Sequence, residues 1–262
     1  MDQDQLITRI TDILREDQRV LGAWLSGSRG RGTEDQFSDV DVWLVVTTAD
    51  KDAFVKEWPA TSDRIGPTVL RQAVFGTTFT HITPEWFRYD VSIGVPDDAS
   101  TRSRTTHKTL FDRANITAQF KPVGDLLQPD PQKVSSLVVE FLRVMGLLPV
   151  VLGRQDFVVG VSGASLLRGL LVQLSIEDVV AEDRGGALSL ERTLQDEQLR
   201  GLADLPALAA TRESVLAVHL ACADLFLPTA RNLMARLGAP WPAPLEDALR
   251  KHLRATIQVD LP

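Results

Sequence analysis

The spacing of the apolar residues changes near Pro129, and this change limits what the chain can fold into. Before it, short apolar runs and the alternating segment from Phe87 to Ile93 are typical of β-strands. After it, apolar residues recur every three or four positions, which is the period of an amphipathic helix. We therefore predict an α+β protein with two parts: a mixed-sheet domain over residues 1–125 and an all-helical bundle over residues 126–262.

The first part is predicted to begin with a helix and to alternate between strands and helices. Its glycine cluster, Gly27 to Gly32, is expected to form a turn or loop. The expected elements are a helix over residues 3–17, strands over 20–25, 40–46 and 87–93, a strand and hairpin over 68–80, and a helix over 50–58 that Pro59 closes.

Two acids mark the exposed start of the apolar strand over residues 40–46. Asp39 and Asp41 are separated by one residue, so their side chains project from the same face of the strand. Two like charges held this close are unfavourable unless a cation lies between them. Because Mg²⁺ prefers carboxylate and phosphate oxygens, the pair predicts a magnesium site at the end of the sheet.

A glycine–serine pair precedes these acids. Gly27 has no Cβ and lets a phosphate approach the backbone, while Ser28 offers a hydroxyl and an N–H group. Arg29 and Arg31 follow and could add charge-assisted contacts to a triphosphate, although both could also be ordinary solvated charges. The arrangement predicts a phosphate-binding turn next to the metal site.

These residues carry a resemblance to a known superfamily. Leu25 to Arg29, followed by Ser38 to Val42, resembles the signature of the DNA polymerase β-like nucleotidyltransferases, a Gly-Ser turn before an acid–hydrophobe–acid triplet. The chain resembles more closely the bacterial nucleotidyltransferases that modify lincosamide and aminoglycoside antibiotics. The length, the N-terminal helix, Gly32 to Asp39, Leu110 to Arg113 and the helical second half carry this likeness. It covers residues 5–115; beyond them only the architecture matches.

The resemblance implies an activity and a set of roles. Residues 1–125 would be the catalytic domain and residues 126–262 the substrate-binding domain. The enzyme would move a nucleoside monophosphate, AMP from ATP, onto a hydroxyl of an aminoglycoside or lincosamide, with Mg²⁺ and release of pyrophosphate. Asp39, Asp41 and the third acid, Asp90, would bind the metal. Either Asp90 or Glu140 would be the general base.

Two other functions fit the same residues. The chain could be a toxin–antitoxin-type or regulatory nucleotidyltransferase that modifies a partner protein. It could also be a binding module that senses a nucleotide without turnover, although acids kept this close together argue against it. Trp24, Trp43 and Trp86 could stack on a nucleobase or could simply pack in and beside strands. The sequence names neither the acceptor nor the nucleobase.

Composition sets further expectations. The net charge of −7 suits a neutral or cationic small substrate and argues against a nucleic-acid partner. The single cysteine, Cys222, cannot form an internal disulfide, and the four histidines lack the spacing of a zinc site. We see no signal peptide and no segment that approaches the roughly 20 uninterrupted apolar residues of a membrane span, so we expect a cytoplasmic protein. It could be a monomer or a homodimer.

Overall fold

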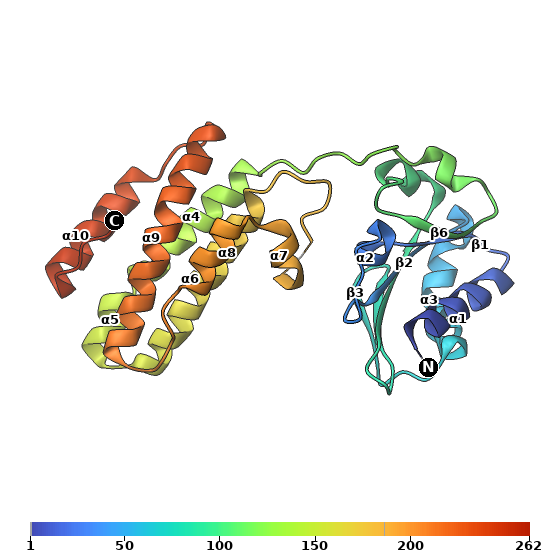
Figure 1. Ribbon diagram of the computed structural model, residues 1–262, viewed down its shortest axis with the longest axis horizontal. Helices are drawn as coiled ribbons and strands as arrows, with labels where there is room; N and C mark the ends of the chain where they lie inside the picture. Colours follow the sequence, from blue (N-terminus) through green and yellow to red (C-terminus); the bar gives the residue numbers. More distant parts are fainter. Residues whose placement is uncertain (1, 186) are drawn as a thin grey trace. The chain divides into compact units, whose positions relative to one another are not determined.

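The computed structural model describes residues 2–185 and 187–262, which divide into two compact units, Met1–Asp125 and Leu126–Pro262. The first unit is built on a mixed sheet, and the second consists of helices (Figure 1). The prediction of an α+β fold with a mixed-sheet part followed by a helical part is confirmed. The change of apolar spacing near Pro129 therefore corresponds to the passage from one unit to the other.

The six-stranded sheet of the first unit has the order β3-β4-β5-β2-β1-β6. Its two central strands, β2 and β5, run parallel, while every other neighbouring pair is antiparallel. Strands buried in the centre of a sheet read as continuous apolar runs, which explains the composition of β2. The strands are β1 (Val20–Leu25), β2 (Val40–Val46), β3 (Leu70–Phe75), β4 (Thr78–Ile82), β5 (Arg88–Gly94) and β6 (Lys108–Asp112).

The two faces of this sheet are covered by different segments. One face packs against α1 (Gln3–Glu16) and α3 (Lys51–Ile65), which bury the apolar stripe predicted for the first helix. On the other face, Trp24 and Trp43 form a second core with residues of the 3₁₀ helices η2 (Pro96–Thr101) and η3 (Ile116–Gln119). The alternation predicted for residues 87–93 is confirmed, because Tyr89, Val91 and Ile93 all face the first core.

Two local predictions are wrong. The glycine cluster forms a one-turn helix, α2 (Gly27–Arg31), because the Ser26 carbonyl accepts the Gly30 N–H at 2.8 Å. The next helix, α3, does not end at Pro59 but runs on to Ile65. Proline removes only one backbone donor, and the burial of Trp58 and Ile65 on either side of it stabilises the continued helix.

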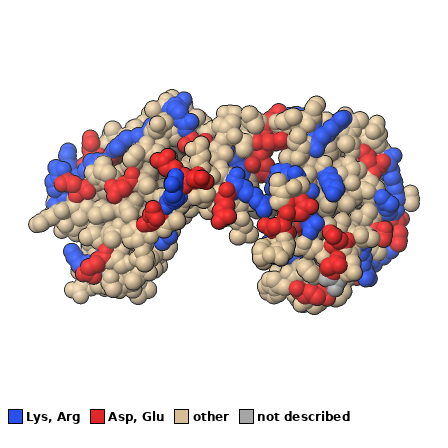
Figure 2. Space-filling model, in the orientation of Figure 1, with Lys and Arg blue, Asp and Glu red and all other residues tan. Residues whose placement is uncertain are grey.

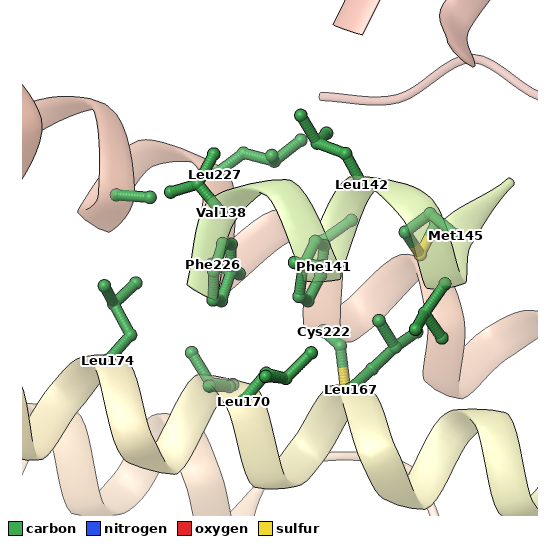
Figure 3. Packing of buried hydrophobic residues seen from close by; sticks show 14 of the residues in the cluster. Val138, Phe141, Leu142, Met145, Leu167, Leu170, Leu174, Cys222, Phe226 and Leu227 are labelled. Carbon is green, nitrogen blue, oxygen red and sulfur yellow. The ribbon is translucent and has the colours of Figure 1, made fainter. Parts of the chain in front are cut away.

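The second unit buries a large apolar core between its longer helices and a smaller apolar cluster around residues 148–152. Figure 3 shows Phe141 of α4 beside Phe226 of α9, with Leu167 and Leu170 of α6 close by, and the two rings stack at 3.8 Å between centroids. The helices are α4 (Pro131–Met145), α5 (Leu148–Arg154), α6 (Phe157–Glu177), α7 (Leu190–Thr193), α8 (Asp196–Ala203), α9 (Arg212–Arg236) and α10 (Ala243–Ile257), with a 3₁₀ turn η4 (Ala187–Ser189).

Three helical stretches of this unit are long and apolar enough, by length and composition, to cross a membrane: Pro131–Arg154, Phe157–Glu177 and Arg212–Arg236. The expectation that no segment comes near this threshold is therefore wrong. Each stretch packs part of its apolar surface into the cores of the unit, while other apolar side chains, such as Val139, Val158 and Leu166, are exposed. Charged side chains of both signs are mixed over the face drawn in Figure 2.

Candidate active site

The sheet brings two of the three predicted acids side by side. Asp41 on β2 and Asp90 on β5 are register partners on neighbouring parallel strands, so their backbones lie about 4.8 Å apart. Both are half-buried, on the face that also carries Trp43 and Ser92. Asp39 lies just before β2, and its Oδ2 is 3.3 Å from the Arg88 guanidinium. The three acids therefore gather where β2 and β5 begin.

The electrostatics of this group are unfavourable as it stands. Burial, followed by the negative charges of Asp39 and Asp90, raises the pKa of Asp41 to about 6, while Arg31 and Arg88 only partly oppose the rise. Burial also raises the pKa of Asp90, against a hydrogen bond from Thr80. Carboxylates that share a site and lack enough positive charge favour the binding of a cation or a proton.

The turn at Ser26 and Gly27 is hydrogen-bonded directly to the backbone of Asp41. The Ser26 N–H donates to the Asp41 carbonyl at 2.9 Å, and Gly27 follows with φ of +58°. A Cβ on Gly27 would lie 1.9 Å from Asp41 Oδ2, so a side chain cannot fit without displacing the carboxylate. Glycine at this position thus permits both the left-handed backbone and the close approach of the turn to the acid.

The three remaining residues of the predicted phosphate turn lie in α2 but differ in their surroundings. Ser28 is half-buried, and its carbonyl accepts the Thr33 N–H at 2.9 Å. Arg29 turns back to α1, where it donates to the Gln3 side chain and lies 3.6 Å from Asp4. Its side chain is only 10% exposed. Arg31, in contrast, lies close enough to Asp41 to lower the pKa of that acid.

The acids fit Mg²⁺ as part of a shared site rather than as a complete protein cage. Over residues 2–185 and 187–262, no three or more His, Cys, Asp or Glu side chains are positioned to hold a metal by themselves. The ion pair with Arg88 engages one oxygen of Asp39. Magnesium commonly takes one or two carboxylates and completes its shell with water and substrate phosphates, and Asp41 with Asp90 meets that requirement.

Sequence reasoning missed several side chains around the acids. Thr80 on β4 lies opposite Asp90 in the register and hydrogen-bonds to its carboxylate. Arg88, the first residue of β5, pairs with Asp39. The antiparallel pairing of β4 with β5 places Thr80, and no short-range pattern in the sequence announces which threonine will face the acid.

Of the other candidate residues, two tryptophans are buried in the core, one glutamate is paired on the surface, and one tryptophan is exposed. Trp24 and Trp43 are buried, with 0% and 2% exposure, and pack in the second core, so neither ring is free to stack on a base. Glu140 on α4 accepts two hydrogen bonds of 2.7 Å from Arg143, so its carboxylate forms an ordinary surface ion pair. Trp86 is 72% exposed and remains available to a ligand.

A mixed sheet that sets a Gly-Ser turn against strand-borne carboxylates is the arrangement expected of a nucleotidyltransferase. The model of the streptomycin adenylyltransferase family matches residues 1–256, which is nearly the whole chain. The chain belongs to the streptomycin adenylyltransferase family. It is therefore an antibiotic-modifying nucleotidyltransferase, an enzyme of the class that transfers AMP to an aminoglycoside.

Among solved structures, the chain is similar to an aminoglycoside 6-adenyltransferase from Bacillus subtilis. The two share 16% identity over 96% of this chain and 98% of that chain, with a TM-score of 0.43. No sequence among the curated proteins matched this chain. The family assignment accordingly rests on the family model alone.

Proposed function

We propose that the protein transfers AMP from ATP to a hydroxyl of streptomycin or a closely related aminoglycoside and releases pyrophosphate. The acceptor oxygen attacks the α-phosphorus, the bond from that phosphorus to the bridging β-phosphate oxygen breaks, and the hydroxyl proton passes to a protein base. The observation that carries this proposal is the register of Asp41 and Asp90 beside the Gly27 turn. A hydroxylated, cationic acceptor also suits the net charge of −7.

Asp41 and Asp90, with Asp39 beside them, would hold Mg²⁺ in this reaction. The ion would neutralise the triphosphate and align the α-phosphorus for attack. In support, burial and mutual repulsion keep the pKa of Asp41 and of Asp90 above the ordinary value, so the acids gain most when a cation binds. The assignment of all three as metal ligands remains a prediction.

The phosphate turn would position the nucleotide. Gly27 allows the phosphates to reach the backbone, and Ser28 offers its hydroxyl and N–H groups. Arg31 is better placed than Arg29 to contact a phosphate, because Arg31 lies near Asp41 whereas Arg29 is engaged with Gln3 and Asp4. We therefore propose Arg31 as the phosphate ligand and Arg29 as the residue that holds the turn against α1.

Asp90 is the stronger candidate for the general base. It lies beside Asp41, and in the metal-free protein burial raises its pKa toward the pH at which a base works well, a rise that bound Mg²⁺ would oppose. The Thr80 hydroxyl hydrogen-bonds to the Asp90 carboxylate and would orient it. Glu140, by contrast, is already paired with Arg143 on the surface of α4, and its pKa lies below the ordinary value because of that hydrogen bond.

Pyrophosphate release from ATP, measured with streptomycin and Mg²⁺, tests the proposal. We expect release that requires both the aminoglycoside and the divalent ion, and a product whose mass exceeds that of the antibiotic by one adenylyl group. The Asp41→Asn variant should show none, while Glu140→Gln should keep the full rate. Absence of turnover with every aminoglycoside, under conditions in which the protein is folded, would reject the assignment.

The roles of the two units, with residues 1–125 catalytic and 126–262 binding the acceptor, belong to the same proposal, as does a cytoplasmic location. The family assignment favours a small-molecule acceptor over a partner protein. Co-purification of a protein that gains the mass of AMP would favour the partner-modifying alternative instead.

A further inference from the structure

Two successive hairpin turns of the first unit each contain a residue in the left-handed conformation, glycine in one turn and tryptophan in the other. The turn between β3 and β4 places Gly76 at φ of +56°, where a Cβ would meet nothing within 4 Å. The turn between β4 and β5 places Trp86 at φ of +69°. A bulky residue in the left-handed region is an outlier, since its Cβ crowds the following carbonyl.

The geometry of the second turn shows that glycine would suit it better. Thr83 and Phe87 pair across it, with the Thr83 N–H donating to the Phe87 carbonyl at 2.9 Å, and the Trp86 N–H donates to the Thr83 carbonyl at 2.9 Å. This is a three-residue hairpin loop that ends in a left-handed residue, a position that usually carries glycine. Since the indole of Trp86 is 72% exposed, core packing does not account for it.

The strained turn lies at the catalytic end of the sheet. Trp86 precedes Arg88, the first residue of β5 and the ion-pair partner of Asp39, by two positions. Asp90 follows two positions later, about 13 Å along an extended chain from Trp86. In the turn that leads into the neighbouring parallel strand β2, Phe37 precedes Asp39 by two positions and is 79% exposed. Two exposed aromatic rings therefore flank the acids at the same end of the sheet.

The charges around these rings favour a cation. Glu34 and Asp35 lie three and two residues before Phe37 in an exposed loop, and Glu85 directly precedes Trp86 in its turn. Arg88, two residues after Trp86, is already paired with Asp39. An aromatic face attracts a guanidinium or ammonium group, and nearby carboxylates add to that attraction. The same carboxylates would repel the triphosphate of ATP, so the charge pattern points to the acceptor rather than to the nucleotide.

We propose that Trp86, with Phe37, is the stacking platform of the aminoglycoside acceptor and holds a cationic ring of the sugar against the indole beside Asp39 and Asp90. This inference rests on the proposed function. It assigns a cause to the strained turn, because backbone strain that core packing does not explain is found where a ligand uses the strained residue.

Steady-state kinetics and a binding titration of the parent and the Trp86→Ala variant test the platform. We expect KM for streptomycin, and its Kd without ATP, to rise roughly 3- to 30-fold, the range of an exposed to a desolvated cation–π contact. KM for ATP and kcat should stay unchanged. Trp86→Phe should recover most of the loss. Phe75→Ala is the matched control. Phe75 is 79% exposed, but it lies beside the turn between β3 and β4, at the other end of β4 from the turn that contains Trp86.

The Trp86→Gly variant separates ligand binding from folding. Glycine relieves the left-handed strain, so we expect a higher Tm together with the same loss of streptomycin affinity as in Trp86→Ala. An unchanged Kd for streptomycin in Trp86→Ala would overturn the inference, as would a rise confined to KM for ATP or a parent that binds no aminoglycoside. A parent that binds streptomycin through Trp86 but never releases pyrophosphate would sustain the platform and reject the proposed function.

Discussion

Asp41 of the sheet unit and Glu246 of the helical unit have opposite electrostatic surroundings. In the helical unit, Glu246 on α10 accepts hydrogen bonds from Trp241 at 2.6 Å and Arg250 at 2.8 Å and pairs with Arg231. Burial alone would raise the pKa of Glu246, but these partners more than offset it, and the pKa lies below its ordinary value. In the sheet unit, Arg31 and Arg88 only partly oppose the effects of burial and of the neighbouring Asp39 and Asp90, and the pKa of Asp41 rises to about 6.

A second acid of the helical unit follows the same rule. Glu177 at the end of α6 is 2% exposed and pairs with Arg184 at 2.9 Å and Lys133 at 2.6 Å. Burial raises its pKa, yet hydrogen bonds from Lys133, the Asp130 N–H and Arg184 bring the pKa below its ordinary value. The acids that hold the bundle together are thus neutralised within the protein, whereas Asp41 and Asp90, at the start of β2 and β5, keep a raised pKa.

The first and largest test of this contrast is the Asp41→Asn variant. Removing the charge should lower kcat/KM by roughly a thousandfold or more, since a metal ion supplies several kcal/mol of transition-state stabilisation. Asparagine keeps the shape, so the fold should persist. Pyrophosphate release at saturating ATP measures the loss, and circular dichroism confirms the fold. Substantial remaining activity would place the metal elsewhere.

Glu246→Ala, in contrast to Asp41→Asn, should lower stability and leave the activity of the folded protein unchanged. It leaves the arginines without their shared acid and should lower the free energy of unfolding by about 3 kcal/mol, at the lower end for a broken buried pair because Arg231 is 41% exposed. The activity per folded molecule should be unchanged. Urea unfolding monitored by fluorescence measures the stability. A variant as stable as the parent would show that the ion pairs of Glu246 do not stabilise the helical unit.

The pH dependence of the free energy of unfolding tests the raised pKa of Asp41. An Asp with a pKa of about 6 in the folded state and 3.8 when unfolded binds its proton more tightly in the folded protein between pH 4 and 6. The free energy of unfolding of the metal-free protein should therefore fall as pH rises through that window, by about 1–3 kcal/mol, and then level off. Thermal melts in chelator measure this slope. The Asp41→Asn variant should lose most of it.

The smallest effect is expected at Glu140. Its pairing with Arg143 lies on the surface of α4, where solvent screens an ion pair strongly. Glu140→Gln should therefore change neither Tm nor kcat measurably. A clear fall in kcat with normal folding would make Glu140 the base in place of Asp90.

Much of the sheet unit could be predicted because its strands carry their own signal. The apolar run of β2 spans residues 40–46 as expected, and the alternation predicted for residues 87–93 is found in β5. These periodicities are local and survive in a single sequence. The parallel pairing that sets Asp41 against Asp90 is not local, and the resemblance to a known family, rather than any spacing, brought the two together.

The errors arise where tertiary contacts decide the outcome. Proline usually closes a helix, but burial of Trp58 and Ile65 carries α3 past Pro59. The role of Arg29 as a phosphate ligand stays a prediction, but the contacts of its guanidinium with Gln3 and Asp4 from α1 could not be predicted from the sequence. The left-handed backbone of Trp86 could not be read from its neighbours either, because glycine is the residue that signals such a turn.

Calorimetric titration of Mg²⁺ into the protein with a non-hydrolysable ATP analogue tests whether Asp41 and Asp90 bind Mg²⁺ together with ATP. Because a cation displaces the proton that Asp41 holds below its pKa of about 6, binding should release more protons at pH 5.5 than at pH 8. Buffers of different ionisation enthalpy report that number, and titration of the analogue without protein supplies the baseline. Proton release beyond the baseline that disappears in Asp41→Asn is the predicted result. Binding that is indifferent to pH and to this substitution would contradict the account.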